Sequence, residues 1–138
     1  MRAVFSPSEA RGTVSAVPSK SHAHRLLIAA ALADAPCRVV CPVTSRDIEA
    51  TVGCLNALGA SVTRTVDGYD VVPADRGALP ETALLDCGES GSTLRFLLPV
   101  ACALGEKSTF TGGGRLPSRP IAELAKTLRE GGIRLSAD

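Results

Sequence analysis

Three short segments of the chain combine hydroxyl residues with Lys or Arg in a way that suits the binding of an anion. Residues 19–25 read S-K-S-H-A-H-R, residues 90–95 read S-G-S-T-L-R, and residues 114–120 read G-R-L-P-S-R-P. Serine hydroxyls donate hydrogen bonds to phosphate oxygens, lysine supplies a compact charge, and arginine supplies a forked donor for phosphate or carboxylate. The residue types therefore favour a ligand with phosphate or carboxylate groups.

The first two segments also stand where helices are predicted to begin. Ser19 and Ser90 suit the N-cap position, and an arginine follows each about one turn later, Arg25 or Arg95. A helix start offers free N–H groups and the positive end of the helix dipole, which attract anions. Gly91 would let the backbone approach a ligand closely. Taken singly, such a start is more often a plain cap beside a solvated charge, so the chemistry depends on the segments acting together.

The charges of these segments leave two interpretations open. Lys20 and Arg25 adjoin a helix whose next residues are all apolar, so they need a partner, and a ligand anion would serve. Arg115 and Arg119 flank a proline-stiffened loop. That loop is either a surface turn with exposed charges or a clamp for carboxylate or phosphate.

Other reactive residues point to no catalytic or metal site. His22 and His24 lie two apart, so a helix would not put them on one face as paired metal ligands, and both are interpreted as ordinary helix-start residues. Asp47 and Glu49 fail as an acid–base pair for the same reason. The five cysteines are odd in number and form no C-x-x-C, which favours small buried thiols in a reducing compartment. We expect no metal ligands and identify no catalytic residue within the chain.

The bulk composition is that of an ordinary globular protein. The chain has 138 residues, 45% hydrophobic and 21% charged, with a net charge of +1, enough for one compact domain with an apolar core. The balance excludes disorder and offers no basic field for nucleic acid, and 3% aromatic residues leave no base-stacking platform. No signal peptide opens the sequence, and the longest apolar stretch, Leu26–Ala33, is too short for a bilayer. We expect a soluble, cytoplasmic protein without membrane contact.

An internal repeat organises the chain. Ser19-Lys20-Ser21 and Ser90-Gly91-Ser92 are 71 residues apart, and each precedes a Leu-Leu pair and an Ala-rich run. The next predicted helix in each copy repeats at an offset of 73 residues. Ile48 matches Ile121, Leu55 matches Leu128, and Gly59 matches Gly132. Self-similarity at a fixed spacing predicts a fold built from duplicated units.

The two copies are predicted to be αβ units with helices and strands in the same order. The first has strands at 12–17, 38–43, 61–66 and 69–72 and helices at 19–33 and from Thr44 or Ser45 to 58, with Asp67-Gly68 as a hairpin turn. The second has strands at 83–87, 107–111 and 133–137 and helices at 90–104 and from Arg119 or Pro120 to 130. A looser link, 73–81, joins the copies.

The two kinds of helix differ in their surroundings. Residues Leu26–Ala33 and Phe96–Leu104 are apolar on every side, which predicts burial all round. The helices near 46–58 and 119–130 carry charges on one face, as outer helices do. A Rossmann sheet fits poorly, because no G-x-G-x-x-G follows a strand and the hairpin interrupts strict βαβ alternation.

These segments together resemble a known family. S-K-S-H-A-H-R-L-L-I-A-A-A-L-A is similar to the first signature of 5-enolpyruvylshikimate-3-phosphate synthase, with its S-K-S-x-x-x-R core. G-E-S-G-S-T-L-R at 88–95 resembles the second signature, and R-L-P-S-R-P-I at 115–121 resembles the R-x-x-x-R-P segment. The three occur in the family's order and at about its spacing, and the resemblance covers nearly the whole chain.

The resemblance implies a fold and a reaction. The family transfers the enolpyruvyl group of phosphoenolpyruvate to the 5-hydroxyl of shikimate 3-phosphate and releases phosphate, a step of the shikimate pathway towards chorismate and the aromatic amino acids, and it needs no cofactor. Its fold is an inside-out α/β barrel of βαβαββ units, with helices inside and sheets outside. Residues 1–138 would then be part of one enolpyruvyl transferase-type domain, with a first unit at 12–73 and a second, incomplete unit at 83–138.

The same resemblance assigns roles to particular residues. Lys20, Ser21 and Arg25 would bind shikimate 3-phosphate, and Lys20, Gly91 and Arg119 would bind phosphoenolpyruvate. Arg95 and Arg115 would be further contributors. The chain departs from the family at two positions, where Asn often stands in place of Glu89 and Pro in place of Phe96; we expect Glu89 to point away from the site or to pair with a nearby arginine.

The resemblance also defines what the chain would need. Family members are roughly three times as long, beyond the size of one domain, and their second domain would supply the opposite wall of the cleft. We therefore expect no turnover by this chain alone. Two alternatives stay open: a non-catalytic anion-binding domain, and the related transferase that acts on UDP-N-acetylglucosamine.

Overall fold

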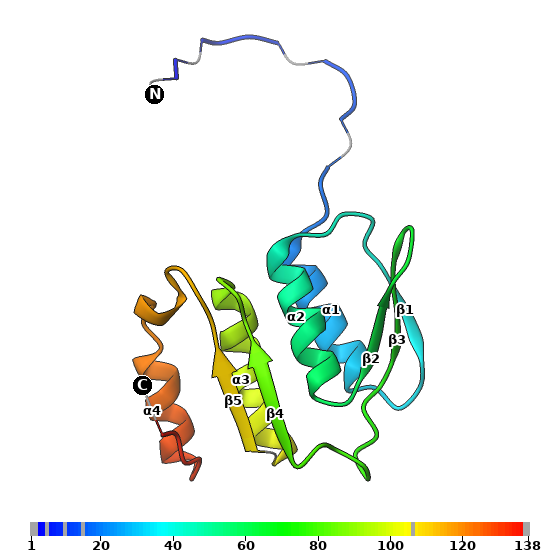
Figure 1. Ribbon diagram of the computed structural model, residues 1–138. Helices are drawn as coiled ribbons and strands as arrows, with labels where there is room; N and C mark the ends of the chain where they lie inside the picture. Colours follow the sequence, from blue (N-terminus) through cyan, green and yellow to red (C-terminus); the bar gives the residue numbers. More distant parts are fainter. Residues whose placement is uncertain (1–2, 5, 10, 15, 106, 137–138) are drawn as a thin grey trace.

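A computed structural model describes residues 3–4, 6–9, 11–14, 16–105 and 107–136. The order of elements is that of a mixed α/β chain, with α1 (Lys20–Ala31), β1 (Cys37–Val40), α2 (Arg46–Ala57), β2 (Ser61–Arg64), β3 (Gly68–Val72), β4 (Thr82–Asp86), α3 (Gly91–Leu104), β5 (Lys107–Thr111), the 3-10 turn η1 (Leu116–Ser118) and α4 (Ala122–Glu130). The described residues that precede α1 lead away from the folded body (Figure 1).

The first sheet has three strands in the order β1-β3-β2. β3 runs antiparallel to both neighbours, with Val39 opposite Tyr69 and Val62 opposite Val71. These four side chains are buried while their neighbours along each strand point to solvent, the alternation expected of a sheet with one covered face. Gly68 opens β3 against the carbonyl of Val39, where a Cβ would collide with backbone.

Helices α1 and α2 cover the inner face of this sheet. Leu27 and Ala31 of α1 and Ile48 and Leu55 of α2 are almost wholly buried, and they share one apolar core with the strands. In Figure 1 the two helices lie between the three-stranded sheet and the β4–β5 pair. The core is built mainly from Ala, Val, Leu, Ile and Cys, with Tyr69 buried among them.

The second sheet is a parallel pair, β4 and β5, joined through α3. Leu84 lies opposite Thr109 and Leu85 opposite Phe110 in the register. Helices α2 and α3 lie on one side of this pair, and α4 lies on the other (Figure 1). Since the two strands are parallel, the loops after β4 and after β5 meet at one edge, where Gly113 N–H donates to the carbonyl of Gly88 at 2.8 Å.

Most predicted elements are confirmed, and the differences lie at the ends. β5 has the predicted bounds, the hairpin at 67–68 is present, and α1, α2 and α3 begin after Ser19, Ser45 and Ser90. The predictions of strands at 12–17 and 133–137 are wrong for the described residues of both ranges, since neither is paired with another strand. A strand needs a hydrogen-bonding neighbour, and the described chain offers none to these segments.

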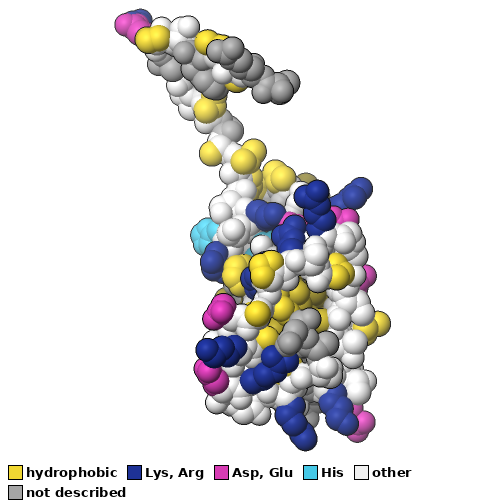
Figure 2. Space-filling model, turned by 90° about the vertical axis from the view of Figure 1, so that its left-hand side faces the viewer, with side chains coloured by type: hydrophobic (Ala, Val, Ile, Leu, Met, Phe, Trp, Pro, Cys, Tyr) yellow, Lys and Arg dark blue, Asp and Glu magenta, His cyan; other side chains and the backbone are white. Residues whose placement is uncertain are grey.

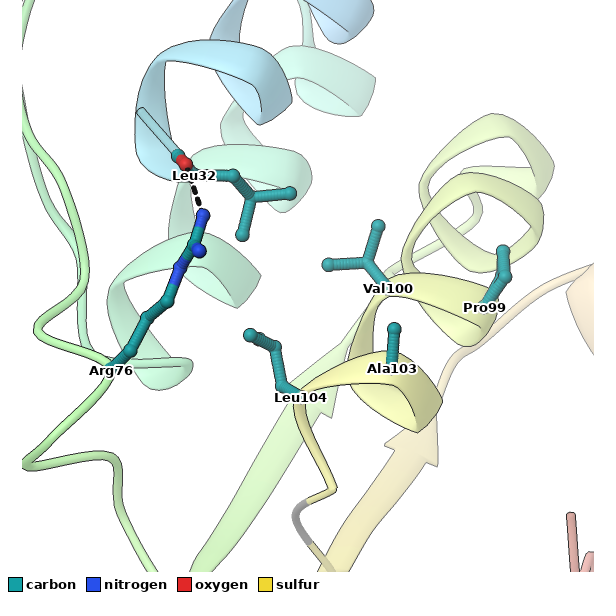
Figure 3. A pocket seen from close by; sticks show the side chains of 6 residues that line it. All are labelled: Leu32, Arg76, Pro99, Val100, Ala103 and Leu104. Carbon is teal, nitrogen blue, oxygen red and sulfur yellow. Dashed lines mark hydrogen bonds between the residues drawn. The ribbon is translucent and has the colours of Figure 1, made fainter. Parts of the chain in front are cut away.

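The prediction that two helices are buried all round is also wrong for the described chain. Leu26 of α1 is 42% exposed, and the apolar side chains of α3 at Pro99 and Val100 are only partly covered. Near their C-terminal ends, α1 and α3 line an apolar hollow of about 430 Å³ with Arg76, whose guanidinium donates to the carbonyl of Leu32 at 2.9 Å (Figure 3). An apolar helix is buried only where another element covers it, and no described element lies over this hollow.

Candidate functional site

Three helices begin with a serine cap. The hydroxyl oxygens of Ser19, Ser45 and Ser90 accept hydrogen bonds from backbone N–H groups three residues later, at 3.3, 3.3 and 3.2 Å. Each cap satisfies one N–H of the first turn and leaves others directed outwards from the helix. Ser19 and Ser90 confirm the predicted starts, and of the two residues proposed for α2 the cap is Ser45.

The three helix starts lie together in space. Lys20 Nζ at the start of α1 forms an ion pair of 2.5 Å with Asp47 in the first turn of α2. The hydroxyl of Thr93 in the first turn of α3 donates to the backbone carbonyl of Asp47 at 3.2 Å. Asp47 therefore joins the start of α2 to the starts of both other helices. Three positive dipole ends converge on one region, which favours an anion there.

A chain of buried hydrogen bonds, here called the hydroxyl chain, links the three helices beneath their exposed starts. It consists of one imidazole and three hydroxyl groups. His24 Nδ1 lies 2.7 Å from Thr51 Oγ1, which lies 2.7 Å from Thr93 Oγ1, which lies 2.7 Å from Ser90 Oγ. All four side chains are at most 2% exposed. Buried polar groups of this kind are costly unless paired, and paired they define a single arrangement of the helices that carry them.

His24 is thus not the ordinary helix-start residue that the sequence indicated, although His22 is, being exposed. The missed signal was periodic: His24 lies three residues before Leu27 and therefore on the buried face of α1. Burial lowers the pKa of His24, with Asp47 opposing this effect and the positive charges of Lys20 and Arg25 adding to it. Its Nε2 is buried without a hydrogen-bond partner.

The residues predicted for shikimate 3-phosphate occupy the exposed first turns of α1. Ser21 is exposed, and its carbonyl accepts a hydrogen bond from Arg25 Nη1 at 3.1 Å. The guanidinium carbon of Arg25 lies 4.9 Å from the centre of the Phe96 ring on α3. Lys20 keeps a side-chain exposure of 49% despite its ion pair with Asp47. The structure therefore leaves all three side chains within reach of a ligand.

The second group gathers around Gly91 at the start of α3. A Cβ on Gly91 would lie 2.8 Å from the Nη1 atoms of both Arg95 and Arg119, so glycine is what lets the two guanidinium groups approach the backbone. Arg95 donates to the carbonyls of Gly91 and Pro120, at 3.4 and 2.9 Å. The structure thus brings Gly91, Arg95 and Arg119 together. Arg115 takes part in the loop through its backbone carbonyl, which accepts from Ser118.

Three of these arginines keep their charge available. Among the described residues, no carboxylate pairs with Arg25, Arg95 or Arg119. The carboxylate of Glu89 lies against Gly114 and pairs with no arginine of the described chain. Figure 2 shows Lys and Arg side chains towards both ends of this face of the body, with one group at the end next to the N-terminal segment. Guanidinium groups held by carbonyls and an aromatic face can still bind phosphate or carboxylate.

Two other kinds of site are absent from the described residues. No three His, Cys, Asp or Glu side chains are grouped as metal ligands there. None of the described helices has the length and apolar character needed to cross a bilayer.

Comparison with known proteins identifies the family. The sequence profile described as EPSP synthase (3-phosphoshikimate 1-carboxyvinyltransferase) matches residues 4–138. The chain belongs to the EPSP synthase family. The resemblance of the three signature segments is confirmed by this match.

The relatives of this EPSP synthase chain are enzymes of the same name. The 3-phosphoshikimate 1-carboxyvinyltransferase of Clostridium beijerinckii is 38% identical over 136 residues, which cover 94% of this chain and 31% of that protein. That of Methanosphaerula palustris is 43% identical over 129 residues, 89% of this chain and 30% of that protein. The chain thus spans about a third of the length of these relatives.

The fold agrees with solved EPSP synthases. The EPSP synthase from Acinetobacter baumannii superimposes with a TM-score of 0.75 at 27% identity, over 89% of this chain and 28% of that one. A second structure of EPSP synthase from the same organism, described as a 2.37 Angstrom structure, gives a TM-score of 0.75 at 25% identity. The α/β fold is therefore confirmed by comparison.

Proposed function

We propose that the protein to which this chain contributes transfers the enolpyruvyl group of phosphoenolpyruvate to shikimate 3-phosphate, giving 5-enolpyruvylshikimate 3-phosphate and phosphate. The convergence of three helix starts carries the proposal, because it gathers several cationic side chains in one region. Lys20 is paired with Asp47, while Arg25, Arg95 and Arg119 have no carboxylate partner among the described residues. Both substrates are multiply charged anions, and such a region suits them. Membership of the EPSP synthase family supports the choice of reaction.

The residues divide between the two substrates by position. Lys20, Ser21 and Arg25, on α1, are proposed to bind shikimate 3-phosphate. Gly91 and Arg119 are proposed to bind phosphoenolpyruvate, with the N–H groups that the first turn of α3 leaves without an intrahelical partner beside a forked donor. Lys20 is proposed to contact both substrates.

Arg95 is proposed to support the phosphoenolpyruvate group. It holds the start of α3 to the segment that follows Arg119 through its two carbonyl contacts. No catalytic acid or base is assigned within the chain.

The proposed architecture is one enolpyruvyl transferase-type domain of which residues 1–138 form a part. Residues 12–73 would belong to a first unit of an inside-out barrel, and residues 83–138 to a second, incomplete unit. The order of α1, β1 and α2 in the first and of α3, β5 and α4 in the second supports this assignment. The uncovered apolar side of α1 and α3 is consistent with helices that lie inside a larger assembly.

The chain alone is proposed to bind substrate and not to turn it over. Transition-state stabilisation requires groups on both sides of the cleft, so the second domain would be a necessary partner. A phosphate-release assay of the chain with both substrates should give no sustained turnover. Sustained release of phosphate would contradict the need for a second domain.

Titration distinguishes the proposed substrate from that of the related transferase. Isothermal titration of the chain with shikimate 3-phosphate should give saturable binding that is lost when Arg25 and Lys20 are replaced by methionine. UDP-N-acetylglucosamine serves as the competing ligand, and a chain that prefers it would favour the UDP-sugar enzyme. Unfolding of the double variant, seen by circular dichroism, would instead assign these residues to the stability of the fold.

A further inference from the structure

We infer that Phe96 is a positioning residue for Arg25, and that it sets the orientation in which this guanidinium meets an anionic group of shikimate 3-phosphate. The inference rests on the proposed function and deepens it. Phe96 belongs to α3, the helix whose start is assigned to the other substrate, while Arg25 belongs to α1. Its ring therefore bridges the two substrate-binding helix starts.

The geometry is that of a cation on an aromatic face. The guanidinium carbon of Arg25 lies 4.9 Å from the centre of the Phe96 ring, within the distance of about 6 Å at which such contacts are attractive. Its Nη1 is held by the carbonyl of Ser21 at 3.1 Å. Among the described residues no carboxylate contacts this guanidinium. One carbonyl and one ring therefore determine where Arg25 points, and the remaining N–H groups stay free for a ligand.

The ring itself is held in place. Phe96 is half-buried, and the imidazole of His24 meets it edge to face, with the ring centres 6.2 Å apart and the planes at 65°. His24 is in turn fixed by its hydrogen bond to Thr51. The orientation of Arg25 thus depends on a support that reaches into the core.

An alternative is that Phe96 only fills space between α1 and α3. A space-filling residue can be replaced by another apolar side chain of similar reach, whereas a cation needs the negative face of an aromatic ring. Phe96→Leu keeps the apolar contact and removes the ring. Phe96→Tyr keeps the ring. Phe110→Leu is the matched control, because Phe110 is also half-buried but lies on β5, where no cation among the described residues stacks on its ring.

The first measurement is the affinity of the chain for shikimate 3-phosphate by isothermal titration. Phe96→Leu should bind about three- to fivefold more weakly, while Phe96→Tyr and Phe110→Leu should stay within about twofold of the unchanged chain. Unchanged affinity of Phe96→Leu would overturn the inference. Circular dichroism shows that each variant is folded before titration.

The second measurement reports the stacking directly. The NMR signal of the Arg25 side-chain Nε–H should be shifted upfield by the ring current of Phe96, and it should move to an ordinary position in Phe96→Leu but not in Phe96→Tyr. A signal that stays in place in Phe96→Leu would also overturn the inference. If the unchanged chain binds no shikimate 3-phosphate, the proposed function fails, and the effect of Phe96 on Arg25 is then judged with inorganic phosphate as the probe.

Discussion

Replacing Thr51 by valine tests whether the buried hydroxyl chain holds the helix starts together. Valine has nearly the shape of threonine, so the change removes the hydroxyl without leaving a cavity. Thr51 is 0% exposed and its hydroxyl makes two contacts of 2.7 Å, to His24 Nδ1 and to Thr93 Oγ1. Thr93 keeps Ser90 and the Asp47 carbonyl as partners, whereas the imidazole of His24 loses the one hydrogen bond that it makes with the described residues.

The expected loss of stability follows from these partners. A typical hydrogen bond contributes about 1 kcal/mol, and leaving a buried polar atom without a partner costs about 1–3 kcal/mol. We therefore expect Thr51→Val to lower the free energy of unfolding by about 2–3 kcal/mol. Urea unfolding followed by circular dichroism at pH 7.5 measures this difference. Thr51→Ser, which keeps the hydroxyl, should lose less.

A matched control and a double-mutant cycle make the test decisive. Thr63→Val changes an exposed threonine of β2 and should alter the free energy of unfolding by no more than about 0.5 kcal/mol. In the cycle with His24→Leu, the combined loss should be smaller than the sum by about 1 kcal/mol, because both partners are then absent. Thr51→Val with the stability of the unchanged chain would refute the role of the hydroxyl chain.

Two further predictions concern the same region. Because burial lowers the pKa of His24 below its ordinary 6.5, the unfolded chain takes up a proton more readily than the folded one. The stability due to neutral His24 should be complete above pH 7.5 and should fall as the pH drops below 6.5; urea unfolding between pH 8 and 5.5 checks this, and an equal slope in His24→Leu would contradict it. Gly91→Ala should displace the Arg95 and Arg119 guanidinium groups and weaken phosphoenolpyruvate binding by about tenfold, with little loss of stability because both side-chain ends can move. Titration measures the affinity, and Gly53→Ala, where a Cβ meets nothing within 4 Å, should leave it unchanged.

Local signals in the sequence were sufficient for most of the fold. Ser19 and Ser90 were readable as caps because a small hydroxyl residue precedes a long apolar run, and Asp67-Gly68 was readable as a turn. These elements depend on neighbours in the chain. The segments 12–17 and 133–137 have strand-like composition, but pairing depends on residues distant in sequence, and periodicity contains no information about them.

The candidate site was predictable in its residue types and not in its connections. Lys20, Arg25, Gly91 and Arg119 became candidates because charge and glycine near a helix start suit an anion, and the family resemblance gave each of them a proposed ligand. The bond from His24 to Thr51 joins residues 27 positions apart, and Thr51 to Thr93 spans 42. Nothing local to His24 or Phe96 indicates such partners, since an imidazole or a ring on an apolar face is compatible with many packings.

The hydroxyl chain lies in a region where several like charges repel one another. Three helix starts, each equivalent to about half a positive charge, meet beside Arg25, Arg95 and Arg119, and like charges at close range repel. In the described chain the carboxylate of Asp47 offsets part of this by pairing with Lys20. Helix packing and the four hydrogen-bonded buried side chains hold the helix starts together against the remaining repulsion, and a neutral His24 adds no further charge. An anionic ligand would remove the repulsion, so the arrangement that costs stability without a ligand is the one that favours binding.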